Sequence, residues 1–271
     1  GGRPLGRPTR LLAMSAVDIF DDIRRHAGAA GGKFMHENVV LAAVEEILTQ
    51  QSLDRSAVSY MGALMLSLQS DAGAEPAVYA GVLKLLERAL AHVPRGLLLA
   101  KAGRIAQVVV GVANTQVEQP AVLKPALGCV QCLLGAQPEG AQPTADALKL
   151  FRWLLEFTHH ASPKVRQRGQ QVCVDVLRER SASLSSAAAK FIEARLAAAR
   201  PKDVQPTLLL LHFAKSALPT LQPAHAAATV HALVRLLGVP HPVLARHTTD
   251  TLLAAAAAEG APPLPPAALI G

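Results

Sequence analysis

The sequence predicts an all-α protein in which helical hairpins stack side by side as an α-solenoid. Three observations support this fold class. The 271 residues are 51% hydrophobic but only 3% aromatic, and Ala and Leu, which favour helices, dominate the composition. Apolar residues recur at helical spacing along most of the chain. The predicted helices also follow a regular period.

One hairpin, formed by residues 144–180, shows the repeating unit most clearly. Residues 144–158 predict an amphipathic helix, and a short turn follows at 159–161. Pro163 then begins a second helix, at the position where its missing N–H is harmless, and Ser162 is expected to cap it. Val165 opens the apolar stripe of this second helix. A single hairpin cannot bury such a stripe alone, so the unit predicts a stack.

The spacing of the helices indicates the type of repeat. First helices are expected to begin 39 and 40 residues apart, near Ala145, Leu184 and Ala224. Their partners are expected near Pro163, Asp203 and His241. Pro163 and Pro242, each at the start of a second helix, lie 79 residues apart, which is two periods. This spacing matches HEAT and armadillo repeats and excludes the shorter ankyrin and tetratricopeptide repeats. We therefore expect HEAT/armadillo-like hairpins in a right-handed superhelix.

The N-terminal half continues the pattern and completes the domain organisation. Further helices are predicted over 36–50, 55–69, 75–92, 95–113 and 120–135. We expect a flexible segment at 1–13, a solenoid of about six helix pairs at 14–258, and a Pro-rich linker or tail at 259–271. Because neither end of the stack carries an obviously polar cap, the array is expected to continue in a longer protein.

Basic residues are the strongest candidates for contact with a partner. The formal net charge is +7, which suits an anionic partner but also fits an ordinary basic surface. The candidate RNA- or partner-binding residues are Lys164, Arg168, Arg178 and Arg180 on one second helix, and Lys101 and Arg104 on an earlier one. Pro163, Val165, Arg166 and Pro242 are interpreted as structural repeat positions, with Arg166 expected to pair between repeats. With so few aromatic residues, any RNA contact should be to the phosphate backbone.

No motif in the sequence predicts catalysis. Cys129 and Cys132 form a lone C-x-x-C inside an apolar helical pattern, and we interpret both as buried small residues rather than a redox or zinc site. With Cys173 they are too few for a disulfide framework, which suggests a reducing compartment. No histidine ligand spacing or nucleotide-binding motif is present. We therefore expect no cofactor and no metal. We also expect no membrane span, because no apolar run approaches 18 residues.

Several sequence blocks resemble a known family. Residues 38–70, 154–180, 187–198 and 207–221 are similar to the N-terminal region of the ribosomal-RNA-processing HEAT-repeat export factors, the "ribosomal RNA processing protein twelve-like" group. The order of these blocks matches across roughly residues 36–255. The Ala-Val-Glu-Glu block (43–46) and the Pro-Lys-Val-Arg block (163–166) carry the resemblance together. Either block alone is also compatible with nuclear transport receptors.

The resemblance implies a non-catalytic scaffold in small-subunit ribosome biogenesis. It implies nuclear and nucleolar localisation with shuttling to the cytoplasm, and a place in a large ribonucleoprotein assembly. The implied partners are pre-ribosomal RNA, small-subunit (pre-40S) assembly factors and the Ran-dependent export machinery. Family members are much longer, so this chain would be an N-terminal portion. The alternative is a HEAT-repeat nuclear transport receptor, or another adaptor unrelated to ribosomes.

Overall fold

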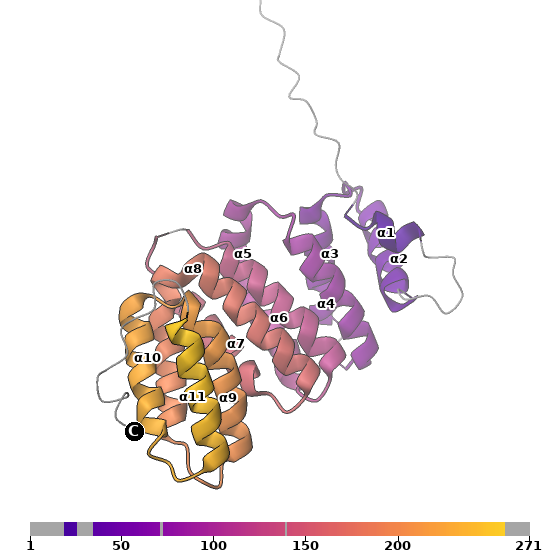
Figure 1. Ribbon diagram of the computed structural model, residues 1–271. Coiled ribbons are helices and arrows are strands. Elements are labelled where there is room, and N and C mark those ends of the chain that lie inside the picture. The colour runs from indigo at the N-terminus through magenta and orange to yellow at the C-terminus, as the bar shows by residue number, and fades with distance from the viewer. Residues whose placement is uncertain (1–18, 26–34, 71–72, 139, 258–271) are drawn as a thin grey trace, which may run out of the picture.

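A computed structural model describes residues 19–25, 35–70, 73–138 and 140–257 (Figure 1). Within these ranges every regular element is helical, which confirms the all-α solenoid. The predicted ends, 1–13 and 259–271, lie outside the described residues. The α-helices are α1 (Asp21–Arg25), α2 (Met35–Gln50), α3 (Ala57–Ser70), α4 (Pro76–Leu90), α5 (Arg95–Thr115), α6 (Pro120–Gly135), α7 (Ala145–Glu156), α8 (Pro163–Ala197), α9 (Val204–Ala217), α10 (Pro223–Leu236) and α11 (Pro242–Ala256). Short 3-10 turns follow α7 (η1, Phe157–His159) and α9 (η2, Leu218–Thr220).

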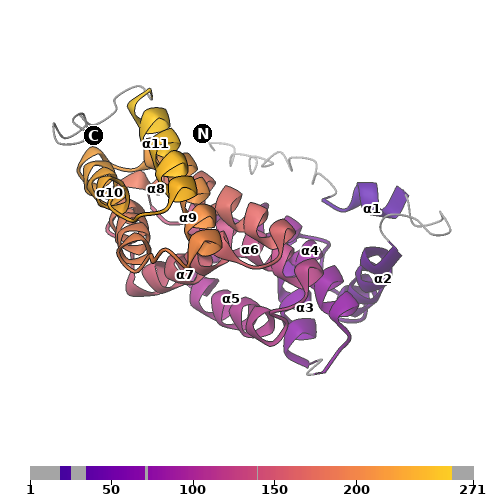
Figure 2. The ribbon, with the colours of Figure 1, turned by 60° about the horizontal axis from the view of Figure 1, so that its bottom comes forward.

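The helices form two rows along a curved array. The inner row contains α2, α4, α6, the first half of α8 (163–179), α9 and α11, and the outer row contains α3, α5, α7, the second half of α8 (181–197) and α10. Neighbours pack within and between the rows. In Figure 2 the array curves so that α4, α6, α9 and α11 follow its inner side and α3, α5, α7 and α10 its outer side. The second helix of each hairpin therefore lines the concave surface, as expected for a solenoid.

Helix starts agree closely with the predicted period. Pro163 and Pro242 occupy the first turns of α8 and α11, which confirms the 79-residue spacing. Thr144 caps α7, because its hydroxyl oxygen accepts a hydrogen bond from the Ala147 N–H at 3.1 Å. Ser162 lies at the N-cap of α8 but its side chain makes no capping hydrogen bond there. The expected N-cap position is therefore confirmed but the capping hydrogen bond is absent, and the backbone N–H of Ser162 donates to His160 Nδ1.

The boundary near residue 181 differs from the prediction. Two separate helices were expected, the later one beginning near Leu184. In the structure α8 runs from Pro163 to Ala197 and bends at Arg180, whose φ of −131° and ψ of 28° are not helical. The buried Arg180 guanidinium donates a hydrogen bond to the Gly135 carbonyl oxygen at the end of α6. A kink thus replaces the loop, and the two halves of α8 still belong to different hairpins.

The core runs between the two rows and continues through the array. On α6 the apolar positions face almost all directions and are buried, including Leu123, Leu127 and Cys129, each 0% exposed. On α8 the predicted stripe is buried from Val165, which is also 0% exposed, to Leu177. Burial on several sides is what a helix between neighbouring repeats requires.

Among the described residues, α5 is long and apolar enough by composition to cross a membrane. The sequence-based expectation missed it because it counted uninterrupted apolar runs, whereas Lys101 and Arg104 interrupt this one. In the structure α5 belongs to the outer row and packs against α6 and α3. Only 28% of its most apolar stretch is buried, so much of this helix faces outward.

A glycine on α8 permits a close approach that an alanine would prevent. A Cβ placed on Gly169 would lie 2.9 Å from the carbonyl oxygen of Phe157 in η1. Since backbone atoms cannot move away easily, we expect Gly169→Ala to lower the free energy of unfolding by about 1–3 kcal/mol. Urea unfolding followed by circular dichroism measures this change.

The matched control is Gly111→Ala on α5, where an added Cβ would meet nothing within 4 Å. Because alanine favours a helix interior over glycine, this variant should be stabilised by about 0.5–1 kcal/mol. Equal effects at the two positions would contradict the close-packing argument.

Candidate partner-binding surface

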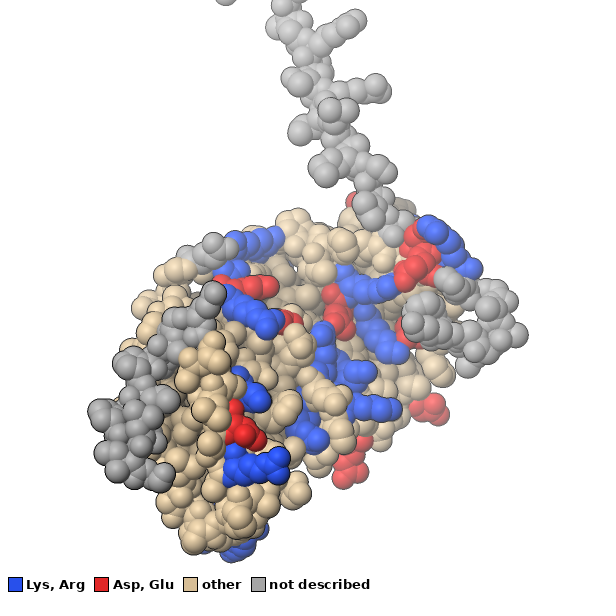
Figure 3. All heavy atoms as spheres, in the orientation of Figure 1, with Lys and Arg blue, Asp and Glu red and all other residues tan. Residues whose placement is uncertain are grey.

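We define the inner face as the solvent-exposed side of the inner row. It carries many Lys and Arg side chains. Figure 3 shows Lys and Arg side chains spread across the side that α4, α6, α8, α9 and α11 present to the viewer, with fewer acidic ones between them. The basic residues that the inner-row helices contribute include Lys84, Arg88, Lys124, Lys164, Arg168, Lys215 and Arg246. These cations divide into those held in ion pairs and those left free.

The N-terminal part of the inner face is largely charge-paired. Lys84 on α4 lies 2.5 Å from a carboxylate oxygen of Glu37 on α2. Arg88 donates two hydrogen bonds, of 2.7 and 2.6 Å, to the Asp22 carboxylate of α1. The Arg88 guanidinium lowers the pKa of Asp22. These pairs hold α1 and α2 against α4, and they reduce the net charge available to an anionic partner.

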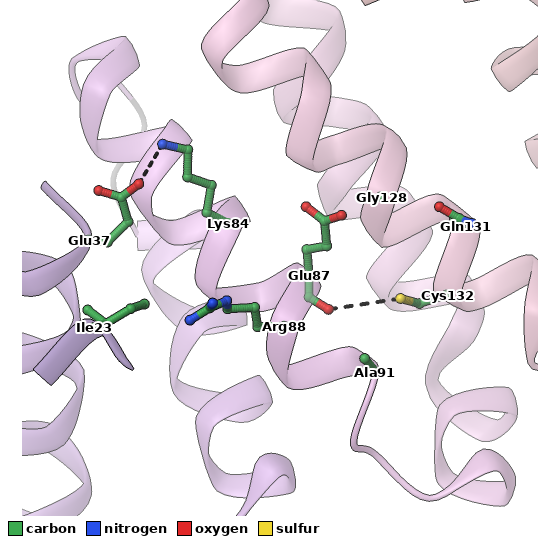
Figure 4. A pocket seen from close by; sticks show the side chains of 9 residues that line it. All are labelled: Ile23, Glu37, Lys84, Glu87, Arg88, Ala91, Gly128, Gln131 and Cys132. Atoms are coloured by element: carbon green, nitrogen blue, oxygen red, sulfur yellow. Dashed lines mark hydrogen bonds and ion pairs between the residues drawn. The ribbon is translucent and has the colours of Figure 1, made fainter. Parts of the chain in front are cut away.

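A third ion pair, between Arg168 and Glu87, joins α8 to α4 next to α6 and is only partly exposed. Arg168 on α8 donates to Glu87 on α4 at 2.8 Å, and the two side chains are 30% and 31% exposed. The Glu87 carboxylate lies over Gly128 of α6, where any Cβ would overlap it. Figure 4 shows Glu87 beside Gly128 and Cys132, in a cavity of about 420 Å³. Burial raises the pKa of Glu87, and Arg168 opposes that rise.

Two of the predicted contact residues lie on the inner-row half of α8 with exposed side chains. Lys164 is exposed in the first turn of α8. Arg178 is 62% exposed and lies 3.1 Å from Asp175 one turn earlier, an arrangement that contributes little to stability at a surface. Arg168 lies between them but is engaged with Glu87. Lys164 and Arg178 are therefore the members of the predicted set that a partner can reach most directly.

The structure does not bring three of the predicted contact residues, Arg180, Lys101 and Arg104, onto this face. Arg180 is buried at the kink of α8. Lys101 and Arg104 lie on α5 in the outer row rather than on a second helix, and Arg104 donates to the Gln69 side chain at 3.2 Å. Arg166 donates to the carbonyl oxygens of His160 and Ala161. Its partners thus belong to its own hairpin, whereas we expected an inter-repeat pair.

Three exposed cations escaped the sequence analysis. Lys124 on α6, Lys215 on α9 and Arg246 on α11 are exposed, and within the described part of the chain none of them is in a recorded ion pair. Each comes from a different hairpin, so no local cluster marks them in the sequence. They can be found in the sequence only once each helix is assigned as the first or second of its hairpin, because each of these second helices then carries one cation on its solvent side.

The cysteines support the interpretation as packing residues. Cys129 is fully buried, and its Sγ lies 3.7 Å from the Leu83 carbonyl oxygen. Burial raises the pKa of Cys129 and of Cys173 well above the usual range, and it raises that of Cys132 to about 11. Burial therefore disfavours, at all three positions, the thiolate needed for nucleophilic or metal chemistry. The predicted burial is confirmed for Cys129, whereas Cys132 is only partly buried and lines the cavity beside Glu87.

The Glu87–Arg168 pair yields a pH-dependent prediction. At pH 7 Arg168→Gln leaves a half-buried carboxylate without its partner and should lower the free energy of unfolding by about 1–2 kcal/mol. Glu87→Gln removes the buried charge and should be close to neutral. Since the raised pKa means that the folded state favours protonated Glu87, wild type should lose stability relative to Glu87→Gln as the pH rises through that pKa.

Urea unfolding of both single variants and the double variant at pH 4.5 and 7 measures this coupling. In the double variant the penalty of Arg168→Gln should shrink. Strict additivity of the two substitutions at pH 7 would show that the pair does not interact.

Comparisons with known proteins agree with the two-row architecture. Residues 24–261 match the family described as "RRP12-like, N-terminal HEAT repeats". The chain is 28% identical over 214 residues to an RRP12-like protein of Homo sapiens and 26% identical over 215 residues to an RRP12-like protein of Gallus gallus. In both cases the match covers 74% of this chain and 16% of the relative. The chain belongs to the family of RRP12-like N-terminal HEAT repeats, which confirms the resemblance of its sequence blocks.

Proposed function

We propose that this chain forms part of a non-catalytic scaffold in small-subunit ribosome biogenesis. In this role it serves pre-rRNA processing and the nuclear export of pre-ribosomal particles, and its inner face binds pre-ribosomal RNA and assembly factors. Membership of the RRP12-like family supports the setting. Because the chain spans 16% of its curated relatives, the activity of a whole protein of this kind is part of the proposal.

The observation that carries the RNA part is a set of exposed cations on the inner face. Lys124 on α6 and Lys164 on α8 are exposed, and within the described residues neither has a recorded ion pair. Arg178 on the same half of α8 adds a third exposed cation. Side chains of this kind neutralise phosphates and release counterions, which gives binding that weakens steeply with salt.

The aromatic residues indicate how RNA would be bound. On the inner-row helices the described aromatic residues, Tyr79 of α4 and Phe213 of α9, are buried. The partly exposed Trp153 and Phe191 lie on the outer-row helices α7 and α8. Without an accessible aromatic platform on the inner face, bases cannot stack there. Binding should therefore go to the sugar–phosphate backbone and show little sequence preference.

Single-stranded RNA binding tests this part of the proposal. Fluorescence anisotropy with a labelled 20-nucleotide RNA should show binding at low salt that falls steeply as salt rises. The double variant Lys124→Glu, Lys164→Glu should bind roughly tenfold more weakly, and its salt slope should drop by roughly 1 to 1.5, as expected for two lost phosphate contacts.

The control is Lys149→Glu, Lys190→Glu, which makes the same charge change on exposed residues of the outer row. This control should bind like the wild type. Undetectable binding at low salt, or equal weakening by both double variants, would remove RNA binding by the inner face and leave a protein-only scaffold.

The cellular part of the proposal is nuclear and nucleolar residence, with shuttling and contact with the Ran-dependent export machinery. Affinity purification of the tagged chain from nuclear extract, with mass spectrometry, should recover small-subunit precursors and their assembly factors. Recovery of Ran and transport cargo without ribosomal proteins would support the alternative, a nuclear transport receptor. A matched pulldown with an unrelated HEAT-repeat protein supplies the background.

A further inference from the structure

A second feature of the inner face is a groove where α8, α9 and α11 meet. The groove has a volume of about 460 Å³ and lies apart from the Glu87 cavity. Helix α9 lies between α8 and α11 and packs against both. All three helices line it, with Arg166 and Gln170 from α8, Leu208, His212 and Lys215 from α9, and Asp250 from α11.

A buried amide fixes the polar part of this groove. Gln170 is only 8% exposed, and its Nε2 donates to the Thr158 carbonyl oxygen at 2.8 Å. This bond leaves Oε1 of Gln170 as the acceptor for His212 Nδ1, 3.0 Å away. Nδ1 of His212 must then donate this hydrogen bond, which fixes the orientation of the ring. The groove therefore presents a polar group that is oriented before any partner arrives.

The apolar part of the groove comes from α9. Leu208 and Leu209 are partly exposed on the inner face, although their neighbours Leu210 and Leu211 are buried. Apolar side chains beside a few fixed polar groups are typical of binding grooves, where apolar contacts supply affinity and the polar groups supply orientation. Among the residues that line this groove none is aromatic, so it offers leucine rather than a stacking surface.

The charge around the groove is predominantly positive. Arg166 and Lys215 line it, against the single carboxylate of Asp250. Lys164 and Arg246 are exposed on the same helices, close in sequence to lining residues. Within the described residues Lys215 and Arg246 have no recorded ion pair. An occupant with carboxylates would therefore find cations on three helices.

We propose that this groove binds an extended acidic segment of a partner protein. An apolar side chain of the segment packs on Leu208 and Leu209, its carboxylates meet Arg166 and Lys215, and its backbone hydrogen-bonds to polar groups such as His212. The assignment rests on the scaffold function proposed above, because it names a partner class for one part of the same inner face. A peptide fits better than RNA here, since the partly exposed leucines beside the cations offer an apolar contact that a sugar–phosphate backbone cannot use.

Peptide binding to the full chain tests the proposal. The probe is a fluorescein-labelled eight-residue peptide of alternating Glu and Leu, and a peptide of alternating Lys and Leu is its counterpart. Anisotropy should show binding of the Glu peptide and at least tenfold weaker binding of the Lys peptide. Lys215→Glu should weaken the Glu peptide roughly tenfold, and Leu208→Gln should weaken it several-fold. Lys190→Glu on the outer row should leave it unchanged.

The outcomes separate this site from the RNA surface. Failure of the wild type to bind the Glu peptide, equal binding of the Lys peptide, or wild-type affinity in Lys215→Glu would overturn the proposal. Circular dichroism checks folding, and Arg246→Glu gives a second charge reversal should Lys215→Glu unfold. If Lys215→Glu weakens the 20-nucleotide RNA as strongly as Lys124→Glu, Lys164→Glu does, the groove belongs to RNA and the peptide assignment is wrong. Loss of RNA binding with intact peptide binding would overturn only the RNA proposal.

Discussion

The packing of α4, α6 and α8 against one another is the interaction on which the rest of the structure depends. Each of these helices is apolar on more than one side, so none can bury its surface within its own hairpin. Leu83 and Leu86 of α4 and Leu127 of α6 are each 0% exposed, because neighbouring repeats cover them. Glycines set how closely these elements approach. Gly128 leaves room for the Glu87 carboxylate, and Gly169 lets α8 meet the turn at Phe157. The curvature of the array and the exposed inner face both follow from this packing.

The same packing decides the electrostatics of the inner face. Close approach of α4, α6 and α8 places Glu87 in a half-buried position, where burial raises its pKa and Arg168 is the main cation that opposes this rise. Pairs from Lys84 and Arg88 neutralise the N-terminal part of the face. Farther along the array the carboxylates become fewer, so Lys124, Lys164 and Lys215 remain available. The inner face therefore has an N-terminal region whose cations are held in ion pairs and a later region whose cations can meet anionic partners. The proposed RNA surface and peptide groove both lie in the later region.

Much of the fold was predictable because each helical repeat carries a recognisable pattern of apolar residues and prolines in its own segment of sequence. Helical periodicity and the Pro163–Pro242 interval identified the hairpins, and the apolar surroundings of Cys129 predicted its burial. The errors have specific physical causes. Ser162 is a good capping residue by type and lies at the N-cap of α8, but its hydroxyl makes no capping hydrogen bond there. A separate helix was expected near Leu184 because the 39- and 40-residue spacing of first helices falls there, and a kink at Arg180 starts the new direction without a loop.

The sequence by itself determined the all-α class and which residues are apolar enough to be buried, because both depend on neighbours within one or two helical turns. The repeat length and the family were also readable from it, because the same local patterns recur in a fixed order along the chain. Only the tertiary structure decided which cations are free. Arg168 meets a carboxylate 81 positions away in the chain, Arg180 meets a carbonyl 45 positions away, and Lys101 and Arg104 belong to the outer row. No local pattern encodes such contacts, since charge pairing depends on which helix faces the stacked repeats bring together. The groove at α8, α9 and α11 has the same origin, because three hairpins contribute its walls.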